Sequence, residues 1–544
     1  MIRVSAFVAV ALTLLGTAAS AQTSSVRDCR NGMDVVLPMV TNGHDAIAVH
    51  ATDDLVGPSI FSRFAKTENG DTINITTKPY DTYNEQIDDY LACDTPFMRV
   101  THAQMSLMAS ITETQDATKM IPIFFYGWSN GAHTLVGRNV DRVSQLSGSK
   151  LAVSPEHIDF ALQLVRQSDD NPELIVSDTA IEDFRNDPSI TFVISNSADA
   201  LILTGGSVGT GAEGSVNGAQ NVISTTSASR VQGDIIVARQ DFVQNNPEVV
   251  NGVVSALLKA EELFREDLKK QTVDFERIAD TLLTDGFEED ILNLWRGVET
   301  VGLAGQVNWS DDTQSRSYRR LINETQNTLV EVGLLTQAIA LENPVIDATA
   351  LGEDLWDKRR VEASGFNQEA AQNAVRDMSQ DEMDGSTIST VTIYFEPNQT
   401  SFDVANYEDA FASALEQTQI YGGAVLSIEA HASYLGYLRG VLQQDWSRAR
   451  QKRELTSLKN TSTARALSVR DALIEAANVF NISVDESQFV INGRGIEDPL
   501  GGFCENALPC PPRTEQEWKD SRRVIFRVIA MESEAEVFTP LNEW

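Results

Sequence analysis

The clearest catalytic pattern in the sequence lies between Gly127 and Gly131, where Gly-Trp-Ser-Asn-Gly matches the G-x-S-x-G string of a nucleophile elbow. In such an elbow a serine stands at a sharp turn from a strand into a helix, and a histidine activates it for acyl transfer. Ser129 follows a strand-like apolar run, and His133 comes shortly after it. Serine hydrolysis at Ser129, with His133 or a later histidine as base, is therefore one hypothesis.

Two features of the sequence count against hydrolysis. Residues 132–138 are short and run on into Asn-Val-Asp-Arg, where an elbow requires an amphipathic helix. An elbow also requires an acid and then a histidine late in the domain, but no histidine lies between His157 and His431. The histidines are His44, His50, His102, His133, His157 and His431. None forms an H-x-x-x-H or HExxH pair, so we expect no catalytic residue, no metal and no cofactor.

A second string, from Gly209 to Gly214, matches the dinucleotide fingerprint G-x-G-x-x-G. That motif requires a strand immediately before it and a helix immediately after it. Here residues 201–207 end in Gly-Gly-Ser, and residues 215–218 are polar and loop-like. We predict a loop over a cleft, or a nest of backbone N–H groups for an anion, in place of a nucleotide site.

The cysteines are expected to form two disulfides. Cys504 and Cys510 enclose a loop of five residues, and their pairing is the natural expectation. The other two cysteines, Cys29 and Cys93, would then pair. That bond would tie the N-terminal end of the exported chain to the first part of the N-terminal domain. A metal site is the alternative, but zinc clusters require CxxC-like spacing or nearby histidines. Disulfides fit an exported protein better.

Residues 1–21 have the pattern of a secretory signal peptide. Arg3 supplies an early positive charge, residues 6–15 form a short apolar core, and Ala19 and Ala21 are small residues before the cleavage point. The core is shorter than the roughly 20 apolar residues of a membrane span. We therefore expect a soluble mature protein outside the cytoplasm.

The charge of the chain excludes one class of partner. There are 42 Lys and Arg against 78 Asp and Glu, a formal net charge of −36. Binding to nucleic acid requires clustered cations that neutralise phosphates, so we expect no nucleic-acid partner. The same balance predicts a repulsive, highly soluble surface.

Hydrophobic periodicity divides the chain. From about residue 33 to 355, strand-like runs such as 120–126 and 234–238 alternate with helical patterns, which predicts an α/β architecture with a mainly parallel sheet. Residues 362–387 have the composition of a linker. Alternating apolar residues then return, with a helix over 462–477, and predict a small α+β domain. Residues 532–544 form an acidic tail.

Four motifs in the C-terminal part resemble the OmpA-like peptidoglycan-binding family. They are Ala430–Gly436, Thr461–Val469, Gly493–Gly495 and Ser521–Val524, in the family's order. The resemblance implies that residues 388–531 bind peptidoglycan of a Gram-negative cell wall.

In that family a turn aspartate and a helix arginine hold the charged ends of diaminopimelate in the wall peptide. Arg465 matches the arginine, whose planar fork suits a carboxylate. Ser433 stands at the aspartate position and carries no charge, which should lose about 1–2 kcal/mol of binding free energy, roughly tenfold in affinity. Arg522 is the third residue assigned to this site. The segment Tyr437–Lys459 is longer than the family's usual connection.

The N-terminal part resembles substrate-binding proteins of ABC transporters, in the nitrate, sulfonate and taurine group. The resemblance is carried by Cys93–Phe97, Phe125–Gly131, Ser195–Ala200, Gly205–Gly209 and Asp234–Phe242 followed by Asn246–Glu248. It implies a two-lobed α/β fold of periplasmic-binding-protein type II over residues 22–361, with the second lobe at about 127–234.

Ligands of open α/β sheets lie beyond the carboxyl ends of strands, which directs attention to Gly127–Gly131. The resemblance implies ligand contacts from Thr95, Ser129, Asn130, Gly131 and Asp199, with Trp128 stacking on the ligand. The expected function is a periplasmic receptor for a small anionic or zwitterionic solute, held at the cell wall and serving an inner-membrane ABC permease. The alternatives are a wall-associated scaffold that has lost its ligand, and the hydrolase.

Overall fold

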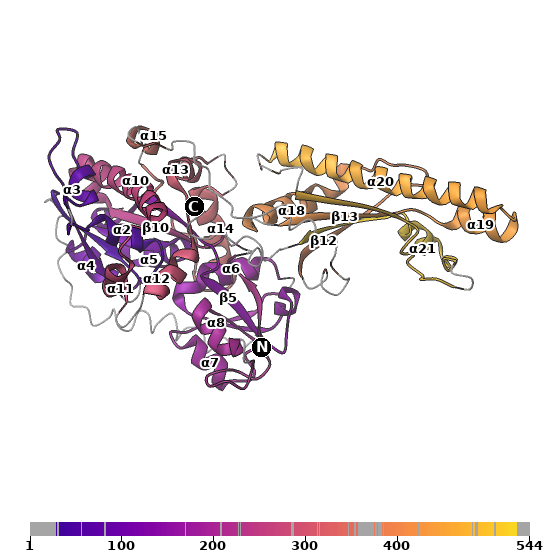
Figure 1. The fold of residues 1–544 in the computed structure, drawn as a ribbon, viewed down its shortest axis with the longest axis horizontal. Coiled ribbons are helices and arrows are strands. Elements are labelled where there is room, and N and C mark those ends of the chain that lie inside the picture. The colour runs from indigo at the N-terminus through magenta and orange to yellow at the C-terminus, as the bar shows by residue number, and fades with distance from the viewer. Residues whose placement is uncertain are drawn as a thin grey trace. The chain divides into compact units, whose positions relative to one another are not determined.

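The computed structural model describes residue 29 and residues 32–529, apart from internal gaps. The gaps are residues 56, 81–82, 169, 207–208, 227, 229, 284–287, 313, 315, 346, 353–354, 357–385 except 375, 378 and 383, and 422–423, 481, 483, 485–487 and 505–507. The expected signal peptide, most of the expected linker and the acidic tail lie outside the described residues. The chain divides into two compact units, unit 1 within residues 1–364 and unit 2 within residues 365–537 (Figure 1). Every helix in the described part is too short or too polar to cross a lipid bilayer.

The first lobe of unit 1 holds a parallel pair, β1–β2, and a sheet in the order β11-β4-β10-β3. Successive side chains of β10 enter opposite cores, with Ile236 and Ala238 in one and Ile235 and Val237 in the other. A strand covered on both faces has to be an unbroken apolar run, as this one is. The strands are β1 Asp34–Met39, β2 Asn74–Pro79, β3 Phe97–Thr101, β4 Met120–Ser129, β10 Gly233–Arg239 and β11 Val298–Thr300.

Helices cover both faces of this lobe. One core includes residues of α2 Asp45–Ala51, α3 Ile60–Phe64, α10 Pro247–Lys270, α11 Phe275–Leu282 and α12 Glu288–Arg296. The other includes residues of α4 Gln86–Ala92, α5 His102–Thr112, α13 Gly302–Ser310 and α14 Tyr318–Glu331. Helix α10 begins at Pro247 because proline suits the first helical position, where no N–H is required.

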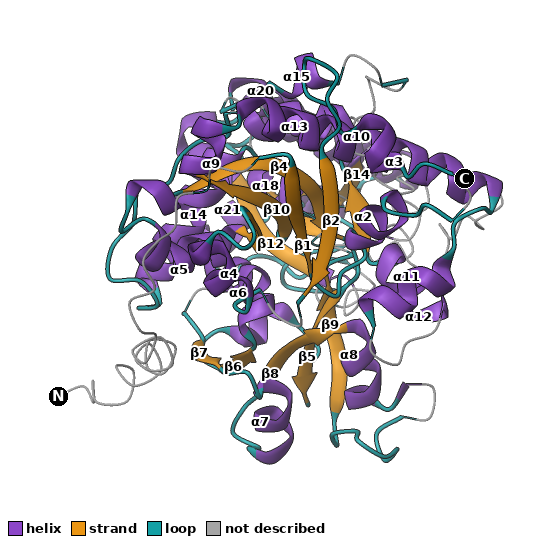
Figure 2. Ribbon diagram, turned by 90° about the vertical axis from the view of Figure 1, so that its left-hand side faces the viewer, coloured by secondary structure: helices purple, strands orange, loops and turns teal. Residues whose placement is uncertain are grey.

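The second lobe is a five-stranded sheet in the order β7-β6-β8-β5-β9, which Figure 2 shows apart from the strands of the first lobe. Its strands are β5 His133–Arg138, β6 Lys150–Val153, β7 Glu173–Val176, β8 Phe192–Asn196 and β9 Ala219–Ser224. Its helices are α6 Ile158–Arg166, α7 Ala180–Asn186 and α8 Ser197–Thr204. A two-lobed α/β unit is thus confirmed.

The expectation of a mainly parallel sheet was wrong, because every neighbouring pair in the four-stranded sheet is antiparallel and the five-stranded sheet is mixed. β10 runs antiparallel to β3 and β4, and β5 runs antiparallel to β8 and β9. The reason is the path of the chain. It leaves the first lobe through β4 and returns through β10, so these neighbouring strands run in opposite directions.

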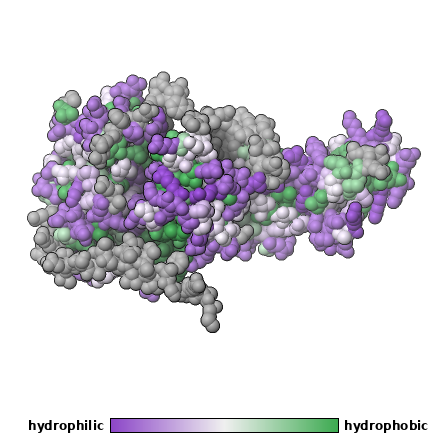
Figure 3. Space-filling model, turned by 90° about the horizontal axis from the view of Figure 1, so that it is seen from below, coloured by the Kyte–Doolittle hydropathy of each residue, from purple (hydrophilic) through white to green (hydrophobic). Residues whose placement is uncertain are grey.

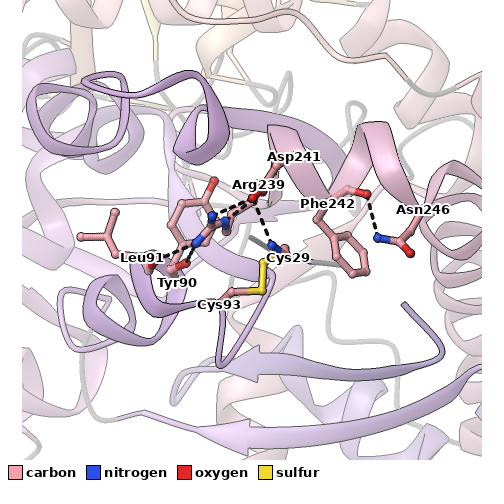
Figure 4. The surroundings of a disulfide bond; sticks show 8 residues. All are labelled: Cys29, Tyr90, Leu91, Cys93, Arg239, Asp241, Phe242 and Asn246. Atoms are coloured by element: carbon pink, nitrogen blue, oxygen red, sulfur yellow. Dashed lines mark hydrogen bonds and ion pairs between the residues drawn. A yellow bond between two sulfur atoms is a disulfide. The ribbon is translucent and has the colours of Figure 1, made fainter. Parts of the chain in front are cut away.

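A disulfide and a buried ion pair fasten residue 29 to the first lobe (Figure 4). Cys29 is bonded to Cys93, which follows α4, and their Cα atoms lie 5.6 Å apart. Arg239, fully buried at the end of β10, donates to both carboxylate oxygens of Asp241, at 3.0 and 2.8 Å, and to two carbonyl oxygens of the last turn of α4. Asp241 also accepts the N–H of Cys29 at 3.2 Å. The second expected disulfide, Cys504–Cys510, is present in unit 2.

Unit 2 is an α+β unit with a mixed sheet in the order β12-β15-β13-β14. The helix expected over 462–477 is only the end of a longer one, α20, which begins at Arg448. The segment Tyr437–Lys459 is therefore mainly helical. The elements are β12 Thr387–Tyr394, α18 Glu408–Ile420, β13 Val425–His431, α19 Leu435–Gln443, α20 Arg448–Val479, β14 Phe489–Gly495, α21 Glu515–Asp520 and β15 Arg523–Ile529.

Replacing Cys29 and Cys93 by serine should destabilise unit 1. The bond joins residues separated by 64 positions, and closing a loop of that length restricts the unfolded chain by about 4 kcal/mol. Urea unfolding of the full chain, followed by tryptophan fluorescence, measures the change. The matched control replaces Cys504 and Cys510, which are in unit 2 and only 6 positions apart. An equal loss in the unit 1 transition for both variants would contradict this assignment.

Candidate functional site

The chain passes between the two lobes of unit 1 twice, through residues 130–132 after β4 and residues 225–232 after β9. Thr225 links the two passages. Its hydroxyl oxygen accepts the N–H groups of Gly131 and His133, at 3.0 and 3.1 Å, and lies 2.9 Å from the hydroxyl of Ser129. The passages are therefore hydrogen-bonded to each other where they cross, and Thr225 is a residue that the sequence did not single out.

Ser129 is part of this crossing. Its side chain is buried, and its hydroxyl lies 2.9 Å from Nδ1 of His133 as well as from Thr225. Its backbone N–H donates to the carbonyl oxygen of Gln232 at 2.8 Å. All of these partners are protein groups, so we assign Ser129 the role of holding the two passages together.

The glycine spacing around Ser129 has a packing explanation. Gly127 has φ +143°, and a Cβ there would collide with the backbone of Glu299 in β11. Gly131 has φ +99°, a conformation that other residues rarely adopt. The G-x-S-x-G string therefore reflects two backbone constraints on the path between the lobes.

A serine–histidine pair is thus present, but the setting differs from a nucleophile elbow. The chain continues from Ser129 into strand β5, where an elbow continues into a helix. The ring of His133 faces the ring of His157, with centroids 4.6 Å apart, and no described carboxylate hydrogen-bonds to His133. Burial, with the neighbouring His157, holds the pKa of His133 well below its usual value.

Asn130, Gly131 and the start of α8 lie together on the second lobe. The hydroxyl of Ser197 donates to the carbonyl oxygen of Gly131, and the backbone N–H of Ser197 donates to the carbonyl oxygen of Ala132 at 3.0 Å. Asn196 caps α8 and donates to the carboxylate of Asp199 at 2.8 Å. Asn130 is half-buried, and its side chain is hydrogen-bonded to no described residue. The structure thus brings Ser129, Asn130 and Gly131 close to the helix turn that carries Asp199.

Two of the expected contact residues lie elsewhere. Trp128 is buried in an aromatic cluster, 4.8 Å from Phe125 and 6.4 Å from His102 between ring centroids, so its indole belongs to the core. Thr95 precedes β3 at the end of the sheet where Ala238 pairs with Phe97. Ser129 lies at the other end of β10, so the structure does not bring Thr95 to the crossing.

The first lobe contributes a polar cluster that the sequence analysis missed. Asp234, at the start of β10, accepts hydrogen bonds from His44 Nδ1 at 2.8 Å, Asn42 Nδ2 at 3.0 Å and the hydroxyl of Tyr83 at 2.8 Å. Arg99 is fully buried, with a guanidinium nitrogen 3.6 Å from Asp234. These partners overcome the cost of burial and hold the pKa of Asp234 well below its usual value. The sequence held one signal for this cluster, because Asp234 stands at the start of the apolar run that forms β10.

Asp159 connects the lobes at a second place. It lies in the first turn of α6 in the second lobe, and its carboxylate accepts the hydroxyl of Thr101 at 2.5 Å and the N–H of Ala103 at 3.0 Å in the first lobe. Ile158 and Leu162 of the same helix pack with Ala103 and residues of α14. Burial raises the pKa of Asp159 to about 6.

In unit 2, Arg465 and Arg522 are buried near each other. Arg465 donates to the carbonyl oxygens of Gln399 and His431, at 3.0 and 3.1 Å. Arg522 donates to the carbonyl oxygens of Phe395 and Trp518, both at 2.9 Å. Burial and the charge of Arg522 lower the pKa of Arg465 to about 10.

These two guanidiniums lack a counter-ion in the described part of the chain. No described carboxylate comes within 4.0 Å of either one, and Glu396 acts on Arg522 only from farther away. Ser433 accepts a hydrogen bond from the indole of Trp518 at 3.1 Å, which places it beside Arg522's partner. Two uncompensated buried cations favour an anionic ligand.

One further cluster in unit 2 has the residue types of a metal site. Ligand atoms of Glu429, His431 and Asp498 all lie within 4.8 Å of one another. These carboxylates already form ion pairs with arginines. Arg494 and Arg527 lie 3.3 and 3.8 Å from Glu429, and a further arginine lies 3.6 Å from Asp498. A divalent cation would be repelled by these guanidiniums, so we assign the cluster to charge pairing within unit 2.

No family model matches this sequence, and no curated protein matches it. Among solved structures, a putative periplasmic sulfonate-binding protein of Methylobacillus flagellatus is 14% identical, with a TM-score of 0.40, over 60% of this chain and 96% of that one. The aliphatic sulphonate-binding protein of Escherichia coli is 12% identical, with a TM-score of 0.36, over 49% and 84%. The nitrate-binding protein of Synechocystis PCC 6803 is 11% identical, with a TM-score of 0.35, over 49% and 70%. Because these similarities are weak, we describe the fold by its strand order alone.

Replacing Asp159 by asparagine should flatten the pH dependence of stability. Because the pKa of Asp159 is raised from 3.8 to about 6 in the folded protein, the folded state binds the proton more tightly than the unfolded state. The stabilisation that Asp159 contributes is then fully present below about pH 4 and is lost, by about 3 kcal/mol, as the pH rises through 6. Asparagine does not titrate and should remove that fall. Urea unfolding between about pH 4 and 7 measures it.

The exposed Asp94, replaced by asparagine, controls for the loss of one negative charge. Parallel pH profiles for the wild type and the Asp159→Asn variant would contradict the assigned role of Asp159.

Proposed function

We propose that unit 1 is a receptor for a small solute and that unit 2 binds a carboxylate of the cell-wall peptide. The observation that carries the receptor proposal is that polar side chains lie at the ends of strands on either side of the crossing between the lobes. The first lobe supplies Asn42, His44 and Tyr83 around Asp234. The second supplies Asn130 and the start of α8. Ligands of α/β sheets bind at such strand ends.

The groups at the crossing favour a zwitterion among the anionic and zwitterionic solutes that the sequence suggests. The half-buried carboxylate of Asp199 suits an ammonium group. The amide of Asn130 suits the oxygens of an acidic group. Arg99 is already surrounded by Asp45 and Asp234, at 3.5 and 3.6 Å, so the strongest cation of this region is compensated.

The proposed location is the periplasm of a Gram-negative cell, with an inner-membrane ABC permease as the partner that takes up the solute. The signal-like residues 1–21 support export, and the two disulfides fit an oxidising compartment. Peptidoglycan is the proposed partner of unit 2, because Arg465 and Arg522 are buried with no carboxylate of the described residues within 4.0 Å. Anchoring by unit 2 would keep the receptor close to the wall.

A thermal-shift screen of the full chain should find the solute. The compounds are taurine, alkylsulfonates, nitrate, phosphate, phosphonates and pyrimidines. A compound at about 100 times its dissociation constant adds about 2.7 kcal/mol of stability and raises the melting temperature by several degrees. The Asn130→Ala variant should lose this shift because the side chain of Asn130 has no other described partner.

The control is Asn308→Ala, which removes an exposed amide of α13 and should keep the full shift. A flat response to every compound, with wall binding intact, would instead favour the scaffold that has lost its ligand.

Restoring an acid at position 433 should tighten wall binding. The Ser433→Asp variant would give the ammonium of diaminopimelate a charged partner beside the two arginines, and we expect about tenfold tighter binding. The Ser433→Asn variant is the uncharged control and should show no gain. The Arg465→Lys variant keeps the charge but loses the planar fork, so it should bind about tenfold more weakly. Cosedimentation of the full chain with purified peptidoglycan measures all three, and equal binding by all of them would refute this site.

A further inference from the structure

Residues 435–460, which comprise α19 and the first part of α20, form a basic hairpin in an acidic protein. They hold six Lys and Arg against two Asp and Glu, whereas the whole chain has 42 against 78. Figure 3 shows hydrophilic side chains projecting at the right-hand end, where unit 2 ends in this hairpin. A local surplus of cations in such a chain is unexpected unless it faces an anionic partner.

Three exposed cations of the hairpin share one face of α20. Arg448, Lys452, Leu455 and Lys459 recur at intervals of four, three and four residues, which places them on one side of α20. All four are solvent-exposed, as is Arg439 on α19. The stripe from Arg448 to Lys459 is about 16 Å long at the helical rise of 1.5 Å per residue.

Most of these cations have no partner in the described part of the chain. Arg439, Arg448, Lys452 and Arg453 have no described carboxylate within 4.0 Å. Lys459 alone forms an ion pair, with the exposed Glu497 at 2.9 Å. The hairpin therefore presents unpaired positive charge to solvent, and that charge does not stabilise the fold of unit 2.

We propose that the basic hairpin is a second contact surface for the carboxylate-bearing polymer whose peptide binds at Arg465, so the inference rests on the proposed function of unit 2. The two sites belong to one helix, because α20 carries both Lys459 and, six residues later, Arg465. A polymer bears carboxylates at repeated intervals, and joining two contacts raises the apparent affinity without any change at the first. The hairpin also offsets the repulsion between an anionic wall and a chain of charge −36.

Two other occupants are distinguishable. Leu442 and Leu455 are 64% and 38% exposed among the cations, a combination that anionic lipid surfaces also bind. The other alternative occupant is the acidic unit 1 of a second copy of this chain, which would present negative charge to the hairpin. The stripe carries one leucine and three cations, so charge is its main feature, and we favour the polymer.

The test compares the wild type with the triple variant Arg448→Gln, Lys452→Gln, Arg453→Gln by cosedimentation of the full chain with purified peptidoglycan. At about 50 mM NaCl the variant should bind about tenfold more weakly, and at about 500 mM the difference should fall below about twofold because salt screens exposed charges. The matched control, Lys269→Gln, Lys270→Gln, Arg296→Gln, removes three exposed cations of unit 1 and should bind as the wild type does.

Peptidoglycan with its carboxylates converted to amides should abolish the difference between wild type and triple variant. A difference that persists on the amidated polymer would overturn the proposal. So would stronger hairpin-dependent binding to phosphatidylglycerol vesicles than to the polymer, or hairpin-dependent dimerisation in sedimentation velocity. If Arg465→Lys weakens binding while the triple variant matches the wild type at low salt, the hairpin proposal fails and the proposed function of unit 2 stands. If the wild type does not bind the polymer, both fail.

Discussion

Strand β10 is hydrogen-bonded along both edges, to β3 and β4, and its two ends fix the polar cluster and the disulfide-bonded end of unit 1. At its first end Asp234 holds His44, Asn42 and Tyr83 in one cluster beside the crossing between the lobes. At its last end Arg239 and Asp241 hold the end of α4 and residue 29. Because one strand carries both, the polar cluster cannot move relative to the disulfide-bonded end without breaking the centre of the sheet.

The two units bury arginine in different ways. In unit 1 the guanidinium of Arg99 lies between Asp45 and Asp234, so burial is compensated by charge even though the distances exceed those of a good hydrogen bond. In unit 2 Arg465 and Arg522 donate to carbonyl oxygens and lie over the rings of Phe395 and Trp518, at 5.1 and 4.3 Å from the ring centroids. Carbonyl dipoles orient a guanidinium but do not neutralise it, and each arginine raises the cost of charging the other. The charge of the first arginine is thus balanced by carboxylates, whereas no described carboxylate balances the other two.

Much of the fold could be predicted from the sequence, and less of the site. Unbroken apolar runs gave β4 and β10, and Pro247 gave the start of α10, because burial and backbone geometry act locally. The antiparallel direction of β10 arises because the chain builds the second lobe between β4 and β10 and then returns to the first. No local sequence pattern predicts that path. Asn130 and Gly131 were found because they follow a strand. The cluster of Asn42, His44 and Asp234 was missed, since its members are up to 192 residues apart and meet only through the sheet.

The lobes of unit 1 touch at the crossing and again at α6, and these two contacts together limit how the lobes can move. At the crossing, Thr225 binds both passages. At α6, Asp159 accepts hydrogen bonds from the first lobe while Ile158 and Leu162 bury apolar surface against it. A rotation about the crossing alone would expose Asp159 and the apolar surface of α6. The second lobe is therefore held to the first both at the crossing and through α6.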